Sequence, residues 1–166
     1  MQATRIDRGS TETTAIYQDG TDLVFERTFD APRERVWKAF MDPDAIPRWW
    51  GPRGTTTTVA EMDVRPGGKW RYISRAPDRD DVSFFGEYLE IEPPERFRWT
   101  FMFDVEGLGE QGGPETFTFE DVGGKTKVTS IGHFGSVEEI AGALATGMTA
   151  GAIETWDRLA AELAKG

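Results

Sequence analysis

The sequence predicts an α+β fold in which a curved antiparallel sheet surrounds one long C-terminal helix. Two observations predict it. From residue 55 onward, stretches of alternating apolar and polar residues are separated by tight turns, which is typical of antiparallel strands. Near the C-terminus, apolar residues recur every three to four positions over about 28 residues, as in an amphipathic helix. A helix of that length must lie across several strands to bury its apolar face.

The N-terminal part combines an expected tail with one strand and two helices. We expect residues 1–20 to be a flexible tail because they are polar and of mixed charge, and residues 21–166 to form one domain. Residues 23–29 are predicted to form a strand. A helix is predicted to start at Pro32, with Val36 and Phe40 on its buried side. A shorter helix is expected to reach Trp49, although Pro47 must distort it.

The middle of the chain is predicted to be a meander of six strands. Short turns such as Pro66-Gly67-Gly68 favour antiparallel neighbours over a βαβ array. Four aromatic residues of the fourth strand alternate on one face. The predicted strands cover residues 55–64, 69–75, 83–91, 96–103, 116–120 and 126–134, with a polar loop at 77–81.

The C-terminal helix begins with a capping box formed by Ser136 and Glu139. Gly142, Gly147 and Gly151 lie inside the apolar pattern, and each costs about 1 kcal/mol relative to alanine. Two explanations are open. The glycines allow the helix backbone to pack closely on the sheet, or they leave room for a ligand.

Composition and charge exclude several classes of protein. The formal net charge of −10 disfavours binding to nucleic acid and to anionic membranes. The sequence contains no apolar run of the ~20 residues that a membrane-spanning helix needs, and no secretory signal pattern. Cysteine is absent, which rules out disulfides and thiolate metal sites. We therefore expect a cytoplasmic protein that neither binds nucleic acid nor inserts into membranes.

No motif indicates a catalytic centre, a metal or a cofactor. Residues 107–112 match the pattern G-x-G-x-x-G, but no helix follows to receive a pyrophosphate, so we interpret them as a mobile loop. Asp78, Asp80 and Asp81 lack the spacing of a calcium loop. The single histidine, His133, cannot form a multi-histidine metal site.

Adjacent tryptophans, Trp49 and Trp50, precede a Gly-Pro turn. Each indole buries roughly 150–250 Å², so the pair requires an apolar environment on both sides of the chain. The pair either fills the core or closes one end of a cavity that holds an apolar molecule. The sequence does not indicate which of the two faces such a cavity.

Four ordered segments carry a resemblance to a known family. They are FDAPRERVW at 29–37, RWWGP at 48–52, EMDVRPGGKW at 61–70 and EPPER at 92–96, followed by Gly147-Met148 and Gly151. Together they resemble the family named for the activator of heat-shock protein 90 ATPase, within the START-like (SRPBCC) superfamily. Ala152 departs from the tryptophan that such sequences usually have after the glycine, and Pro47 stands where a helix former is more usual.

This resemblance, over about residues 23–163, implies a helix-grip fold with a largely apolar cavity between the sheet and the C-terminal helix. Superfamily relatives use such cavities to carry lipids, hormones and polyketides, and a few perform cyclisation or related chemistry there. We therefore expect binding of a small apolar ligand. The expected lining residues are Trp49, Trp50, Trp70, Tyr72, Trp99, Phe101, Met148 and Trp156.

Two other functions are kept as alternatives. The first is a cyclase or hydratase with Arg71, Glu87 or His133 as acid–base groups, although an outer-face position would remove Arg71 and Glu87 from any cavity. The second, implied by the resemblance, is a chaperone partner that activates heat-shock protein 90 in the stress response. Exposed sheet edges also make a homodimer an expectation to test.

Overall fold

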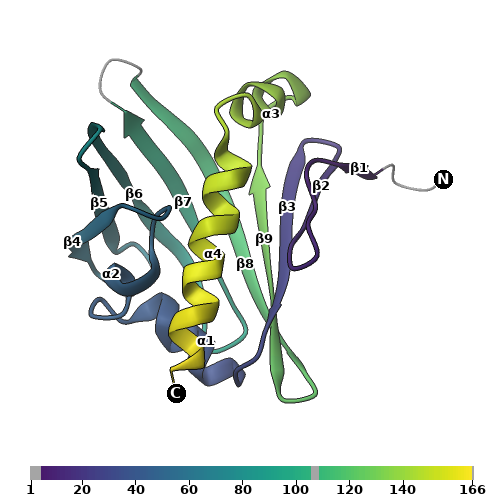
Figure 1. The fold of residues 1–166 in the computed structure, drawn as a ribbon, viewed down its shortest axis with the longest axis vertical. Coiled ribbons are helices and arrows are strands. Elements are labelled where there is room, and N and C mark those ends of the chain that lie inside the picture. Colours follow the sequence, from purple (N-terminus) through teal and green to yellow (C-terminus); the bar gives the residue numbers. More distant parts are fainter. Residues whose placement is uncertain (1–4, 106–108, 166) are drawn as a thin grey trace.

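The computed structural model describes residues 5–105 and 109–165. Within them, nine strands form one antiparallel sheet in the order β1-β2-β3-β9-β8-β7-β6-β5-β4, and α4 runs along one face of the sheet (Figure 1). The elements are β1 (Arg5–Asp7), β2 (Ala15–Asp19), β3 (Asp22–Phe29), α1 (Arg33–Met41), α2 (Ile46–Trp49), β4 (Thr56–Met62), β5 (Lys69–Ala76), β6 (Arg79–Glu92), β7 (Arg96–Val105), β8 (Gly109–Val122), β9 (Lys125–His133), α3 (Val137–Leu144) and α4 (Met148–Ala164). The predicted α+β class and the antiparallel sheet with a C-terminal helix are confirmed.

The inner face of the sheet is the face that packs against α1, α2 and α4. On β7 it carries Phe97 and Trp99, which are both buried, as the alternation of the sequence predicted. Trp156 of α4 packs edge-on against Phe25 and Phe29 of β3, with ring centroids 6.4 and 5.8 Å apart. The C-terminal half of α4 is thereby anchored on the β3 side of the sheet.

The helices α1 and α2 cover one end of the inner face (Figure 1). Phe40 of α1 packs between Trp49 of α2 and the β8 residues Phe117 and Phe119, with centroid distances of 4.9, 5.5 and 5.1 Å. Pro47 lies at the second position of α2, where its missing N–H leaves no helical hydrogen bond unmade. The predicted short helix therefore forms, as a single turn.

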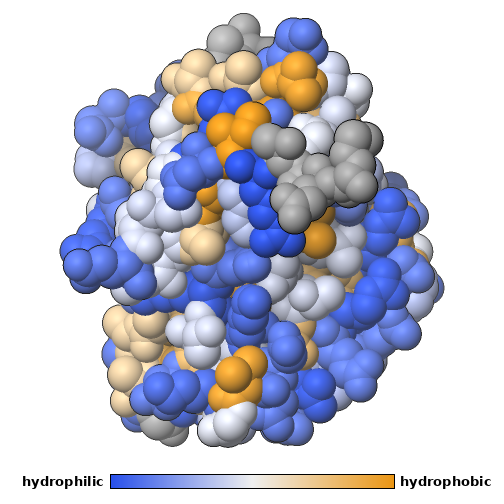
Figure 2. Space-filling model, turned by 90° about the vertical axis from the view of Figure 1, so that its right-hand side faces the viewer, coloured by the Kyte–Doolittle hydropathy of each residue, from blue (hydrophilic) through white to orange (hydrophobic). Residues whose placement is uncertain are grey.

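The expected N-terminal tail instead contains two strands. Within residues 5–19, β1 pairs with β2, and β2 pairs with β3. Ile16 is fully buried on β2, and the backbone N–H of Arg8 donates to its carbonyl at 2.8 Å. The prediction of a tail was wrong here because a few scattered apolar side chains, such as Ile6 and Ile16, are too weak a signal of strands in a polar segment. The side of the molecule that bears this sheet edge is mostly hydrophilic (Figure 2), in keeping with the net charge of −10.

Strands β6 and β8 are longer than predicted. The expected polar loop at 77–81 contains only a tight turn, since β6 already begins at Arg79. Of the glycine-rich loop expected at 107–112, residues 109–112 belong to β8, and residues 107 and 108 lie outside the described residues. Regular pairing with neighbouring strands, rather than local composition, extends both elements.

The single long C-terminal helix of the sequence analysis is two helices. The capping box is confirmed at its start, where the N–H of Glu139 donates to Oγ of Ser136 at 3.2 Å. However, α3 ends at Leu144 and α4 starts at Met148, with Gly147 between them at a φ of 82°. This left-handed conformation is readily accessible only to glycine. Gly142 has open space around it, so close packing on the sheet does not explain that glycine.

Replacing Gly147 or Gly142 by alanine should change the stability of the protein in opposite directions. Gly147→Ala should lower the free energy of unfolding by about 1 kcal/mol because alanine is strained at this φ. Gly142→Ala, inside α3 and unobstructed, should raise it by about 0.5–1 kcal/mol through helix propensity. Urea unfolding of both variants and of the parent protein measures these differences in the free energy of unfolding. Equal shifts in the same direction would contradict the assigned helix break.

No helix of the described residues combines the length and the apolar character needed to cross a bilayer.

Candidate ligand-binding site

The two adjacent tryptophans have different environments. Trp49 is 1% exposed, and its indole Nε1–H donates to the carbonyl of Ala39 at 3.0 Å. Its ring lies 4.9 Å from that of Phe40. Because its ring is covered and its one donor is satisfied by α1, Trp49 belongs to the core between α1 and α2.

Trp50 extends over the inner face of β5, β6 and β7. Its ring centroid lies within 6.3 Å of five aromatic rings on these strands: Tyr72 at 4.9 Å, Phe84 at 5.6 Å, Trp70 at 6.2 Å, and Trp99 and Phe101 at 6.3 Å. Despite these neighbours, Trp50 is only half-buried. This residue is therefore not fully covered by protein.

The backbone that follows Trp50 is held from two sides. Oγ1 of Thr57 donates to the Trp50 carbonyl at 2.8 Å. From α4, Nη1 of Arg158 donates to the carbonyls of Trp50 and Gly51 at 3.2 and 2.9 Å. Gly51 has a φ of 99°, and a Cβ there would lie 2.6 Å from Oγ1 of Thr55, so the turn requires glycine. The position of Trp50 is thus coupled to α4.

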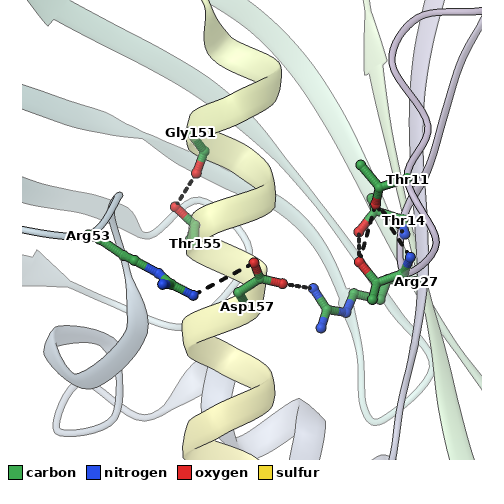
Figure 3. A network of polar contacts seen from close by, with 8 residues as sticks. Thr11, Thr14, Arg27, Arg53, Gly151, Thr155 and Asp157 are labelled. Carbon is green, nitrogen blue, oxygen red and sulfur yellow. Dashed lines mark hydrogen bonds and ion pairs between the residues drawn. The ribbon is translucent and has the colours of Figure 1, made fainter.

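A polar network fixes α4 between β3 and the loop after α2 (Figure 3). Asp157 accepts a hydrogen bond from Nη1 of Arg27 at 2.6 Å and lies 4.0 Å from Nη2 of Arg53. The backbone N–H of Arg53 also donates to Glu154 at 3.0 Å. These contacts hold the middle of α4 on its two sides.

The two halves of α4 differ in burial. Trp156, Leu159 and Leu163 of the C-terminal half are buried. The apolar residues at the end of α3 and in the N-terminal half of α4 are only partly buried: Leu144, Met148, Ala152 and Ile153. Two aromatic residues of the sheet, Phe84 of β6 and Phe101 of β7, are also only partly buried. Apolar surface around Trp50 and the start of α4 is therefore incompletely covered.

A carboxyl group lies beside the aromatic rings on the inner face. Glu115 of β8 stands opposite Trp99 of β7 in the sheet register. Its Oε1 accepts a hydrogen bond from the indole Nε1–H of Trp99 at 2.8 Å, and its Oε2 accepts one from Oγ of buried Ser130 at 3.2 Å. Burial raises the pKa of Glu115 from 4.5 to about 7, against the opposing effects of both hydrogen bonds and of His133.

The family and the solved structures can now be compared with this geometry. The family model described as "Activator of Hsp90 ATPase homolog 1-like protein" matches residues 30–164. The chain belongs to this family. This membership confirms the resemblance carried by the four sequence segments.

Solved structures of bacterial members share the fold. Protein Ms6760 from Mycobacterium smegmatis is 27% identical, with a TM-score of 0.81 over 90% of this chain and 96% of its own. A protein from Arthrobacter aurescens is 26% identical, with a TM-score of 0.81 over 92% of each chain. A protein from Rhodobacter sphaeroides is 26% identical, with a TM-score of 0.79 over 92% of this chain and 98% of its own. No curated protein sequence matches this chain.

Most of the predicted lining residues of this family member lie in one cluster. Trp70 and Trp99 stack with centroids 3.9 Å apart and an interplanar angle of 13°. Tyr72, Phe101 and Trp50 complete the cluster, which we call the Trp50 cluster: Trp50, Trp70, Tyr72, Trp99 and Phe101. Trp49 touches the cluster from the core side, since its ring lies 5.7 Å from that of Trp50 and 4.9 Å from that of Phe40. Trp156 lies outside the cluster, against β3. Met148 is the partly buried first residue of α4.

The three predicted acid–base candidates lie away from the Trp50 cluster. Arg71 alternates with buried Trp70 and Tyr72, so it points to the outer face, where its guanidinium lies 4.5 Å from the ring of Phe85. Glu87 is exposed beside buried Tyr88. His133 bonds with Asp22 at 2.9 Å and with Thr116 at 3.2 Å.

The outer face also carries an open hollow of about 300 Å³, which Lys69, Arg71, Phe85 and Glu87 border. A larger hollow of about 490 Å³ lies between the end of β3 and the C-terminal end of α4, beside Arg27 and Arg35. Charged and apolar side chains border both hollows; Trp70 and Phe85 line the first, and Phe29 and Leu163 line the second.

Glu115 was missing from the predicted site residues. The signal was present, since Glu115 lies two and four positions before Phe117 and Phe119, which are both buried, and so shares their inner face. The predicted strand began at residue 116, one position too late to reveal this.

Proposed function

We propose that the protein binds a small, largely apolar molecule between the sheet and the N-terminal half of α4. The observation that carries this proposal is the partial exposure of Trp50 among five aromatic rings. A core formed by protein alone normally covers a tryptophan at its centre, because each indole gains free energy in proportion to the apolar area buried. A bound apolar molecule would cover the remaining surface.

The proposed lining combines the Trp50 cluster with Phe84 and the start of α4. Six of the residues expected from the sequence are kept as proposed ligand contacts: Trp50, Trp70, Tyr72, Trp99, Phe101 and Met148. Trp49 and Trp156 are assigned a supporting role, since core partners already surround them. Incompletely buried apolar side chains with one convergent polar group are the usual composition of a small-molecule site.

The other expectations remain predictions. Membership of the family supports interaction with a ligand or a chaperone in general. Activation of heat-shock protein 90, a role in the stress response, a homodimer and a cytoplasmic location each need their own test. For the chaperone role, an unchanged rate of ATP turnover by purified heat-shock protein 90 would remove it.

Titration with the neutral fluorescent probe N-phenyl-1-naphthylamine tests the proposal. We expect saturable binding, and we expect Trp50→Ala to raise the Kd about tenfold, equivalent to about 1.4 kcal/mol. Phe85→Ala is the matched control because it removes an aromatic ring from the outer hollow. Absence of binding, or loss of binding in Phe85→Ala rather than in Trp50→Ala, would refute the proposed site.

A further inference from the structure

Glu115 places an acidic group next to the proposed site. Its hydrogen-bond donor Trp99 belongs to the Trp50 cluster, with the Trp99 ring centroid 6.3 Å from that of Trp50. Glu115 is only partly buried as a residue, whereas its partner Ser130 is 5% exposed. The carboxyl group itself is buried beside Trp99 of the Trp50 cluster, and this burial is the main cause of its raised pKa.

The carboxyl group has hydrogen bonds but no lysine or arginine partner in the described part of the chain, and the charge effect that favours its ionised form comes from His133. Both of its partners, the indole of Trp99 and the hydroxyl of Ser130, are neutral donors. Among the described residues, no lysine or arginine nitrogen lies within 4.0 Å of its oxygens. A carboxylate has about four acceptor positions, so each oxygen can accept a further hydrogen bond.

A desolvated carboxylate of this kind discriminates strongly between ligands. It is stabilised by a ligand that brings a hydrogen-bond donor, and most by a cationic one, since charge-assisted hydrogen bonds are about twice as strong as neutral ones. It repels a ligand that ends in a carboxylate, and the net charge of −10 adds to that repulsion.

This inference rests on the proposed function. We infer that the ligand is an apolar molecule that ends in a hydrogen-bond donor, and that this donor bonds to Glu115. An amine is preferred to an alcohol as the donor. Fatty acids and other apolar carboxylates are disfavoured as ligands when Glu115 is ionised. The apolar part of the ligand lies against Trp50, and its polar end reaches the position between Trp99 and Ser130.

Three naphthalenes of similar size test this inference: 1-naphthylmethylamine, 1-naphthylmethanol and 1-naphthoate. Their affinities are measured by displacement of N-phenyl-1-naphthylamine at pH 8, where the amine is cationic and Glu115, with its pKa of about 7, is ionised. We expect the amine to bind about tenfold more tightly than the alcohol, and the carboxylate to bind more weakly than both.

Glu115→Gln keeps the shape and acceptor oxygen of the side chain but removes its charge. We expect this variant to retain saturable binding of the probe, and to bind the amine and the alcohol with affinities within about threefold of one another. Glu87→Gln, at an exposed glutamate of the outer face, is the control and should keep the full preference for the amine.

The outcomes separate the two proposals. Probe binding combined with equal or tighter binding of 1-naphthoate, or with an amine preference that survives in Glu115→Gln, would overturn the role of Glu115 and leave the proposed site intact. If the parent bound neither the probe nor any naphthalene, both proposals would fail.

Discussion

Glu115→Gln should stabilise the folded protein at pH 8.5 by up to about 3 kcal/mol. The pKa of Glu115 is raised from 4.5 to about 7 on folding, so between these values the folded state binds more protons than the unfolded state. Stability of the parent therefore falls as pH rises from about 4.5 through about 7, and the full penalty is present above that range. Glutamine has no such penalty. The 2.5-unit difference corresponds to about 3 kcal/mol.

Urea unfolding followed by tryptophan fluorescence between pH 4.5 and 8.5 measures this effect. The stability difference between Glu115→Gln and the parent should shrink progressively below pH 7 and be small at pH 4.5. Glu87→Gln should follow the parent throughout. Parallel curves for the parent and Glu115→Gln would show that this carboxyl is not desolvated.

Trp49→Ala should lower the free energy of unfolding by about 3–5 kcal/mol, the range for a large aromatic removed from a packed core. The change also leaves the carbonyl of Ala39 without its indole donor. Trp50→Ala should cost less, about 1–3 kcal/mol, because the ring of Trp50 is not fully covered. Conversely, Trp50→Ala should weaken probe binding about tenfold.

Denaturant unfolding of both variants, with probe titration of Trp50→Ala, checks this division of roles. Circular dichroism of Trp49→Ala shows whether enough folded protein remains for the titration. A greater loss of stability in Trp50→Ala than in Trp49→Ala would mean that the assignments of core and site are reversed.

Local patterns of the sequence predicted most of the fold. Alternation of side chains along a strand is a property of neighbouring residues, so Phe97 and Trp99 could be assigned to one face without knowledge of the sheet. The cap of α3 likewise depends only on Ser136 and Glu139. By contrast, β1 and β2 form because β3 offers them an edge, and that pairing leaves little trace in a polar segment.

The break between α3 and α4 shows a second limit. A glycine at the same spacing either continues an apolar helix or ends it in the left-handed region, and the apolar pattern around Gly147 fits both. Glu115 shows a third limit. Its spacing from Phe117 and Phe119 indicates the inner face, but its hydrogen bond with Trp99 is a contact between strands that one strand's pattern does not contain.

The aromatic residues of the Trp50 cluster could be listed from the sequence as a set, but their arrangement could not. Trp49 and Trp50 are chemically identical neighbours, and their different roles arise from distant contacts. The carbonyl of Ala39 holds one of them, whereas rings of β5, β6 and β7 surround the other. From the sequence, either tryptophan could face a cavity. Only the contacts in the folded protein distinguish Trp49 from Trp50.

Two-dimensional NMR of ¹⁵N-labelled protein, titrated with N-phenyl-1-naphthylamine, tests the proposed ligand site at Trp50 most directly. Each of the six tryptophans contributes one indole N–H signal, which reports on its surroundings. If the probe binds there, the signals of Trp50 and Trp99 should shift. The signal of Trp37, whose ring packs against that of Phe119 at 5.2 Å, should not move. No shift of Trp50 at saturating probe would contradict a ligand site between the sheet and α4.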